Sequence, residues 1–211
     1  MATVWKKLAD IGPHDVTLML RQYIQAKAES EGSILFFRMG DFYELFFEDA
    51  VEASELIGLT LTSRDSSGSE ARIPMAGVPV RAVDGYIAKL IKAGRTVTIC
   101  EQLEDPKQVK GIVKRDIVRT VTPGTVLEPD LLDESRNNYL AALALSNGHA
   151  GLAFVDVSTG EFLAAQIEAH IDRTLHDEFV RMGPSEILVP DDMDEAALDA
   201  LKTRFDGVAI T

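Results

Sequence analysis

The sequence predicts an α/β (α+β) chain with two domains, one over residues 1–125 and one over residues 126–211. In the first part, helical patterns alternate with short apolar runs, which is typical of a mixed sheet covered by helices. In the second part, three apolar segments separated by short polar turns precede a helical pattern, which indicates consecutive antiparallel strands. Charge divides the chain at the same place, because residues 1–125 carry 16 Lys and Arg against 17 Asp and Glu, and residues 126–211 carry 5 against 17.

Apolar side chains spaced three and four apart mark the helices of the first domain, which we expect over residues 14–28, 48–58 and 83–93. The last two patterns stop at Gly58 and Gly94, and glycine readily adopts the left-handed conformation that ends helices. Runs rich in β-branched and aromatic residues predict strands. They occupy residues 33–39, 42–46, 59–64, 95–100 and 111–121. The segment "IPMAGVP" contains Pro74 and Pro79 and therefore cannot be a helix interior.

The second domain follows an acidic segment, residues 122–138, which carries Pro123 and Pro129 and is typical of a connection between domains. Its predicted order of elements is β-β-β-α-β-α, with a further strand beginning at the end of the chain. We expect strands over residues 139–145, 151–157, 160–167, 185–190 and 208–211, and helices over residues 172–182 and 194–203.

Composition excludes several classes of protein. A hydrophobic content of 46% and a charged content of 26% describe an ordinary globular chain. There is no apolar run of about 18 residues, as a membrane span would need, and the N-terminus lacks the pattern of a secretory signal. The single cysteine, Cys100, excludes an internal disulfide and a multi-cysteine metal site. We expect Cys100 in the core and the protein in a reducing, cytoplasmic setting.

The motifs of common enzymes are missing: the sequence has no G-x-x-x-x-G-K-[ST], no G-x-S-x-G and no H-E-x-x-H. Asp156 lies in the apolar segment "LAFVDVSTGEF", where a nuclease could hold a metal ion, with Glu161 and Glu178 as possible partners. Two-metal chemistry needs several converging carboxylates, and this spacing does not demonstrate a cluster. We therefore expect Asp156 to accept hydrogen bonds from the "STG" turn, with a nuclease as the alternative.

The stretch "RMGDFYELFFEDA" places Phe42 and Glu44 two residues apart, directly after a predicted Gly40-Asp41 turn. Because side chains alternate in an extended segment, Phe42 and Glu44 point to one face, and Tyr43 and Leu45 point to the other, toward the core. The bland interpretation is that Phe42 packs in the core and that Glu44 is solvated. The functional interpretation is an exposed aromatic ring beside a carboxylate.

Such a pair has a specific use on DNA. A phenylalanine at a protruding turn can enter the minor groove and unstack a base step. A carboxylate beside it would repel phosphates, but when ionised it can accept a hydrogen bond from a ring N–H that a mispaired base leaves free. Protonation of the carboxylate would let it donate to an acceptor atom instead. Unstacking costs a few kcal/mol and is cheaper where pairing is already broken. The pair would thus detect how easily a base step opens, which is a property of deformability rather than of sequence.

The stretch "FFRMGDFYELFFEDA" resembles the mismatch-recognition motif of the MutS family of DNA mismatch repair proteins, whose signature is Phe-x-Glu within G-D-F-Y-E. The resemblance continues in the family's order through "IPMAGVPVRAVDGYIAKLIKAG", "VTICEQLEDP", "VKRDIVRTVTPGT", "NNYLAALAL" and "LAFVDVSTGEF". It covers essentially the whole chain, so chance similarity is not a serious competitor.

This resemblance implies that residues 1–125 form a mismatch-recognition domain and that residues 126–211 form a connector domain with an RNase H-like fold and no nuclease activity. Phe42 would stack on the mispaired base from the minor groove, and Glu44 would form a hydrogen bond to that base. The other DNA-binding residues that it implies lie along the DNA backbone and minor groove: Arg64, Met75, Ala76, Gly77 and Pro79. Weaker candidates, for phosphate contacts, are Arg38, Arg72 and Arg81.

The implied partners are double-stranded DNA with mismatches or small loops and, through the connector, other mismatch-repair proteins, in a bacterial cytoplasm at the nucleoid. Members of the family continue into lever, clamp and ATPase domains, where they bind ATP and Mg and dimerise. This chain stops in or near the connector, so we expect a monomer without ATPase activity or a cofactor. We expect a fragment or truncated reading frame rather than a short natural protein. The alternative function is a connector-type interaction module that does not bind DNA itself.

Overall fold

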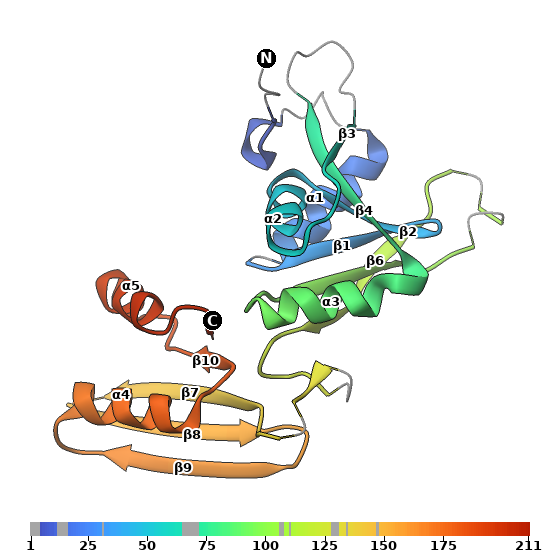
Figure 1. Cartoon of the computed structure of the whole chain (residues 1–211). Coiled ribbons are helices and arrows are strands. Elements are labelled where there is room, and N and C mark those ends of the chain that lie inside the picture. The colour runs from blue at the N-terminus through green and yellow to red at the C-terminus, as the bar shows by residue number, and fades with distance from the viewer. Residues whose placement is uncertain are drawn as a thin grey trace. The chain divides into compact units, whose positions relative to one another are not determined.

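The computed structural model describes residues 5–11, 17–30, 32–64, 72–105, 108–109, 111–127, 131–133, 135–146 and 148–211. The chain forms two compact units, residues 1–120 and residues 121–211, and each has one sheet with helices (Figure 1). The predicted α/β class is confirmed. The predicted domain boundary, after residue 125, lies five residues beyond the division between the units. Gly124 already belongs to the second unit, where its N–H donates to the Glu186 carboxylate at 3.0 Å.

The sheet of the first unit has six strands in the order β3-β4-β2-β1-β5-β6. The strands are β1 (Ile34–Met39), β2 (Phe42–Phe46), β3 (Thr62–Arg64), β4 (Ile73–Pro79), β5 (Val97–Gln102) and β6 (Arg115–Val121). β1 pairs antiparallel with β2 and parallel with β5, and β4 pairs antiparallel with β2 and β3. The sheet is therefore mixed, as predicted, and the "IPMAGVP" segment is one of its strands.

The helices of the first unit are α1 (Leu18–Glu29), α2 (Phe47–Ile57) and α3 (Val83–Lys92), with two 3₁₀ turns, η1 (Leu8–Asp10) and η2 (Val80–Ala82). α1 begins after Thr17, whose side chain accepts a hydrogen bond from Leu20 N at 3.3 Å. The predicted start of this helix, at residue 14, lies outside the described residues. α2 ends at Gly58, which has the left-handed φ of +71° that the sequence predicted.

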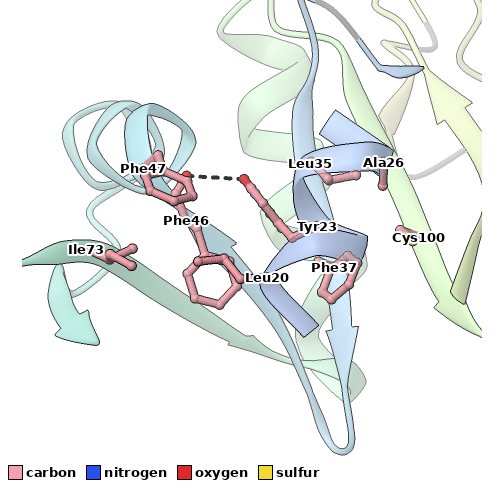
Figure 2. Packing of buried hydrophobic residues seen from close by; sticks show 9 residues of the cluster. All are labelled: Leu20, Tyr23, Ala26, Leu35, Phe37, Phe46, Phe47, Ile73 and Cys100. Carbon is pink, nitrogen blue, oxygen red and sulfur yellow. Dashed lines mark hydrogen bonds between the residues drawn. The ribbon is translucent and has the colours of Figure 1, made fainter. Parts of the chain in front are cut away.

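One core of the first unit lies between α1 and the sheet (Figure 2). Tyr23 of α1 sits at its centre, with edge-on contacts to the rings of Phe37 and Phe46 at centroid distances of 5.5 and 5.0 Å. Its hydroxyl donates to the Phe46 carbonyl at 3.2 Å, the bond drawn in Figure 2. Cys100 belongs to this core, as predicted, and burial raises the pKa of its thiol to about 11.

The second unit confirms the predicted β-β-β-α-β-α order. Its strands are β7 (Tyr139–Ser146), β8 (His149–Asp156), β9 (Glu161–Ile167), β10 (Glu186–Leu188) and β11 (Ala209–Ile210), and its helices are α4 (Ile171–Met182) and α5 (Glu195–Arg204). β7, β8 and β9 form an antiparallel meander, and β10 pairs parallel with β7 and β11. Both helices pack on one cluster around Phe154 and Phe179, and α4 lies along the meander in Figure 1. Among the described residues, no helix is both long and apolar enough to cross a membrane.

Candidate functional site

The hairpin between β1 and β2 ends in a two-residue turn, Gly40 and Asp41, where Met39 pairs with Phe42. Gly40 has a φ of +61°, a conformation that glycine adopts without steric cost. Both turn residues are tied to neighbouring segments: Gly40 N donates to Gln102 Oε1 at 3.1 Å, and the Asp41 carbonyl accepts from Val80 N at 3.0 Å. The turn is therefore anchored on both sides.

Phe42 and Glu44 follow this turn on one side of the sheet, which we call the Phe42 face and define by Phe42, Glu44, Gly77 and Pro79. The ring of Phe42 is 47% exposed, although it is a large apolar side chain. Glu44 is half-buried, and its Oε2 atom is enclosed. The two residues between and beyond them, Tyr43 and Leu45, are buried on the opposite face. The alternation predicted from the sequence is confirmed.

The opposite face anchors the same strand through Tyr43. Its hydroxyl donates to the Glu101 carboxylate of β5, and Arg38 forms an ion pair with that carboxylate at 3.4 Å. The Arg38 guanidinium also lies 5.4 Å from the centre of the Tyr43 ring, which is cation–π distance. Burial and the bond to Glu101 raise the pKa of Tyr43 to about 12, so the phenol keeps its proton at neutral pH. The contacts of Tyr43 thus hold the strand that carries Phe42 in place on the opposite face of the sheet.

Strand β4 lies beside β2 and contains four of the residues that the resemblance implied. Its register pairs Gly77 with Glu44 and Pro79 with Phe42, so both lie on the Phe42 face, and so does Met75, which pairs with Phe46. A Cβ on Gly77 would lie 3.8 Å from Phe42 Cδ1, so this glycine leaves the side of the ring open. Ala76 differs: strand alternation turns it to the opposite face, where it is fully buried.

The four arginines predicted to contact DNA lie at different places in the first unit. Arg64 is the last residue of β3 and its backbone pairs with Ile73. Its side chain and the loop at residues 65–71 lie outside what the structure describes. Arg72 and Arg81 are exposed, whereas Arg38 is half-buried and engaged with Glu101 on the face opposite Phe42.

Sequence reasoning missed Arg115, the first residue of β6. Its guanidinium carbon lies 4.9 Å from the centre of the Phe37 ring, and Phe37 pairs directly with Glu44. The only signal available in the sequence was an arginine within the predicted strand at residues 111–121. That signal does not say which strand β6 adjoins, so it could not connect Arg115 with Glu44.

Asp156, the candidate of the nuclease alternative, is buried and serves the turn that follows it. Its Oδ1 accepts hydrogen bonds from Ser158 N at 2.9 Å, Ser158 Oγ at 2.6 Å and Thr159 N at 3.3 Å. Its Oδ2 accepts from Asn138 N at 3.3 Å. The expected turn role is confirmed. Within the described part of the chain, no three His, Cys, Asp or Glu side chains are grouped so that they could hold a metal ion.

Comparison with known proteins gives two matching family models, MutS domain I over residues 17–130 and MutS domain II over residues 138–211. The DNA mismatch repair protein MutS of Syntrophomonas wolfei is 49% identical over 176 residues, which cover 83% of this chain and 20% of the relative. MutS of Desulfatibacillum aliphaticivorans is 47% identical over 190 residues, 90% of this chain and 21% of the relative. The chain spans about a fifth of the length of these curated relatives.

Proposed function

The chain belongs to the MutS family of DNA mismatch repair proteins, and we propose that it binds mismatched DNA through the Phe42 face. In this proposal, residues 1–125 are the mismatch-recognition domain and residues 126–211 are the connector. The observation that carries it is the position of Phe42, a half-exposed aromatic ring at the end of an anchored hairpin, with Glu44 on the same face.

The ring acts as a wedge. Apolar side chains that enter the minor groove unstack a base step and kink the duplex. Stacking on an aromatic side chain returns about 1–3 kcal/mol per base, against a cost of a few kcal/mol for opening the step. A mispaired base is already partly free of its partner, so the balance favours insertion there. Glu44 then accepts a hydrogen bond from the exposed base, and this bond is one that a fully paired base does not offer.

Residues of β4 and β3 flank the wedge. Met75, Gly77 and Pro79 share the face with Phe42, which supports their contact with the minor groove, and Arg64 is proposed to reach the DNA backbone. The burial of Ala76 on the other side leaves its side chain out of this surface. No cofactor is needed for binding of this kind, because the energy comes from stacking and hydrogen bonding.

The charge of the chain limits the affinity that these contacts can provide. Residues 1–125 have nearly balanced charges and residues 126–211 are strongly acidic, so few phosphates can be neutralised. We expect weak, salt-sensitive binding by this chain alone, with mismatch preference rather than tight affinity as its signature.

Fluorescence anisotropy with labelled G·T, single-base-loop and homoduplex DNA, titrated with salt, tests the proposal. The wild-type chain should prefer both defects over homoduplex, and Phe42→Ala should remove that preference. Phe162→Ala is the matched control, because Phe162 is an exposed phenylalanine of the second unit, 65% accessible. The recognition role is wrong if wild type shows no mismatch preference, even when two copies are fused to a dimeric scaffold.

A second function, protein docking by the connector, is favoured by the charge of the second unit. Asp191 and Asp192 are exposed, and Asp194 next to them caps α5 by accepting from Ala197 N at 3.2 Å. Charge reversal at Asp191 and Asp192, with Asp194→Asn to keep the cap, should weaken binding of a basic mismatch-repair partner. Unchanged partner binding in a pull-down with purified repair proteins would count against this surface.

A further inference from the structure

The guanidinium of Arg115 lies over Phe37, the residue of β1 that pairs with Glu44. In the register of β1 and β2, Phe37 is the residue directly opposite Glu44, so the two side chains lie on the same face of the sheet. The guanidinium carbon of Arg115 lies 4.9 Å from the centre of the Phe37 ring. The arginine charge therefore lies over the neighbour of Glu44, on the inner side of the Phe42 face.

The orientation of this guanidinium is fixed by groups from three segments. Nε donates to the Arg38 carbonyl at 2.8 Å, and Nη1 donates to Gln22 Oε1 at 2.9 Å and to the Val113 carbonyl at 3.1 Å. Nη2 contacts Met39 Sδ at 3.3 Å. Gln22 is itself held, because its Nε2 donates to the Val113 carbonyl at 3.2 Å. All four partners of the guanidinium are uncharged, so they orient the positive charge without cancelling it.

The electrostatics of the pair agree with this geometry. Burial lowers the pKa of Arg115, and the negative charge of Glu44 opposes that shift. Arginine nevertheless stays protonated in proteins. Glu44 has one enclosed carboxylate oxygen, and enclosure alone disfavours the ionised form of a carboxyl group. A fixed neighbouring cation has the opposite effect.

We propose that Arg115 is a positioning residue that holds Glu44 as an ionised, acceptor-only carboxylate and so selects mismatches that present a ring N–H. This inference rests on the proposed function and adds the choice among mismatches. Once the ring of Phe42 has opened the step, the bases of a G·T pair offer guanine N1–H and thymine N3–H, whereas neutral adenine and cytosine of an A·C pair offer ring nitrogens that only accept. An ionised Glu44 binds the first kind and repels the second. Arg115 thereby sets specificity without touching the DNA.

Binding of G·T, A·C and homoduplex DNA by five variants tests this role. Arg115→Met keeps the apolar stem over Phe37 and should reduce the preference for G·T over A·C about tenfold, the scale of one hydrogen bond to a charged group. Arg115→Lys should restore part of the preference. Arg119→Met removes the same charge from an exposed position of the same strand and should leave the preference unchanged. In a Glu44→Gln background, Arg115→Met should have no further effect.

A measurement without DNA tests the positioning role of Arg115 separately from mismatch binding by the Phe42 face. The ¹³C signal of the Glu44 side-chain carboxyl, assigned by its loss in Glu44→Gln, should shift in Arg115→Met and stay in place in Arg119→Met. If the signal does not respond to Arg115→Met, or to the equally uncharged Arg115→Gln should the Met variant not fold, the positioning role is wrong while the proposed wedge role of Phe42 still stands. A preference for G·T over A·C that survives Arg115→Met also overturns it. A wild type without mismatch preference removes the proposed function, and the selectivity claim with it.

Discussion

The contrast between Phe42 and Phe46 separates a binding residue from a core residue on one strand. Both are phenylalanines on the same side of β2, but Phe42 is 47% exposed and Phe46 is fully buried. Complete burial of a phenylalanine side chain is worth about 1.5–3 kcal/mol, so the half-buried ring of Phe42 contributes about 1 kcal/mol. Truncation of the buried Phe46 also leaves a cavity beneath Tyr23, and phenylalanine-to-alanine changes of that kind cost about 3–5 kcal/mol.

Thermal unfolding followed by Trp5 fluorescence measures this difference, because Trp5 is the only tryptophan and lies in the first unit. At about 4 °C per kcal/mol for a domain of this size, Phe42→Ala should lower Tm by about 4 °C and Phe46→Ala by more than about 10 °C. Phe42→Ala should therefore lose mismatch preference while remaining folded. Equal losses of Tm for the two variants would mean that Phe42 is part of the core and would contradict its assignment as an exposed binding residue.

Two further predictions concern buried groups, one inside each unit. Burial raises the pKa of Asp49, against the lowering effect of its ion pair with Lys27 at 2.7 Å, so the folded state keeps this proton to higher pH than the unfolded state. Stability of the first unit should then fall as pH rises from the ordinary value of 3.8 through the raised folded value, and Asp49→Asn should flatten that decline in Trp5-monitored urea unfolding; parallel pH profiles would contradict it. In the second unit, a Cβ on Gly124 would lie 2.9 Å from Glu186 Cβ, so Gly124→Ala should destabilise that unit by about 1–3 kcal/mol. Faster amide hydrogen exchange in β7 would show this, and unchanged exchange would show that the turn can move aside.

The sequence was sufficient for features that depend on local pattern. The alternation of Phe42, Tyr43, Glu44 and Leu45 follows from strand geometry alone, and the structure confirms it. The end of α2 at Gly58 follows from the same kind of local rule. The same alternation separates Ala76 from Met75, Gly77 and Pro79, yet the resemblance had presented the segment as one continuous contact surface. A strand rule applied to that segment would have predicted which of its side chains face away.

Features that depend on strand order and helix docking were not accessible from the sequence. Arg115 and Glu44 are far apart in the chain, and the Arg115 guanidinium reaches Phe37, the partner of Glu44, only because β6 lies beside β5, β5 beside β1, and β1 beside β2. Gln22 reaches the Arg115 guanidinium only because α1 docks on this side of the sheet. Pairing between distant segments is set by the packing of the whole core, and no local pattern encodes it.

The position of α1 explains why one strand carries both core and site. Tyr23 of α1 covers the rings of Phe46 and Phe37, and the sheet continues past this cover toward the Gly40-Asp41 turn. Glu44 pairs with Phe37, the last residue pair next to the Tyr23 ring, and Phe42 belongs to the following pair, with Met39, nearer the turn. The same residue type is therefore a core ring at Phe46 and an exposed ring at Phe42. Phe42 and Glu44 lie on the same strand as the packed residue Phe46 and beside the strand of the packed residue Phe37, so the core holds their backbone rigidly. A site that must discriminate between base steps requires such rigidity.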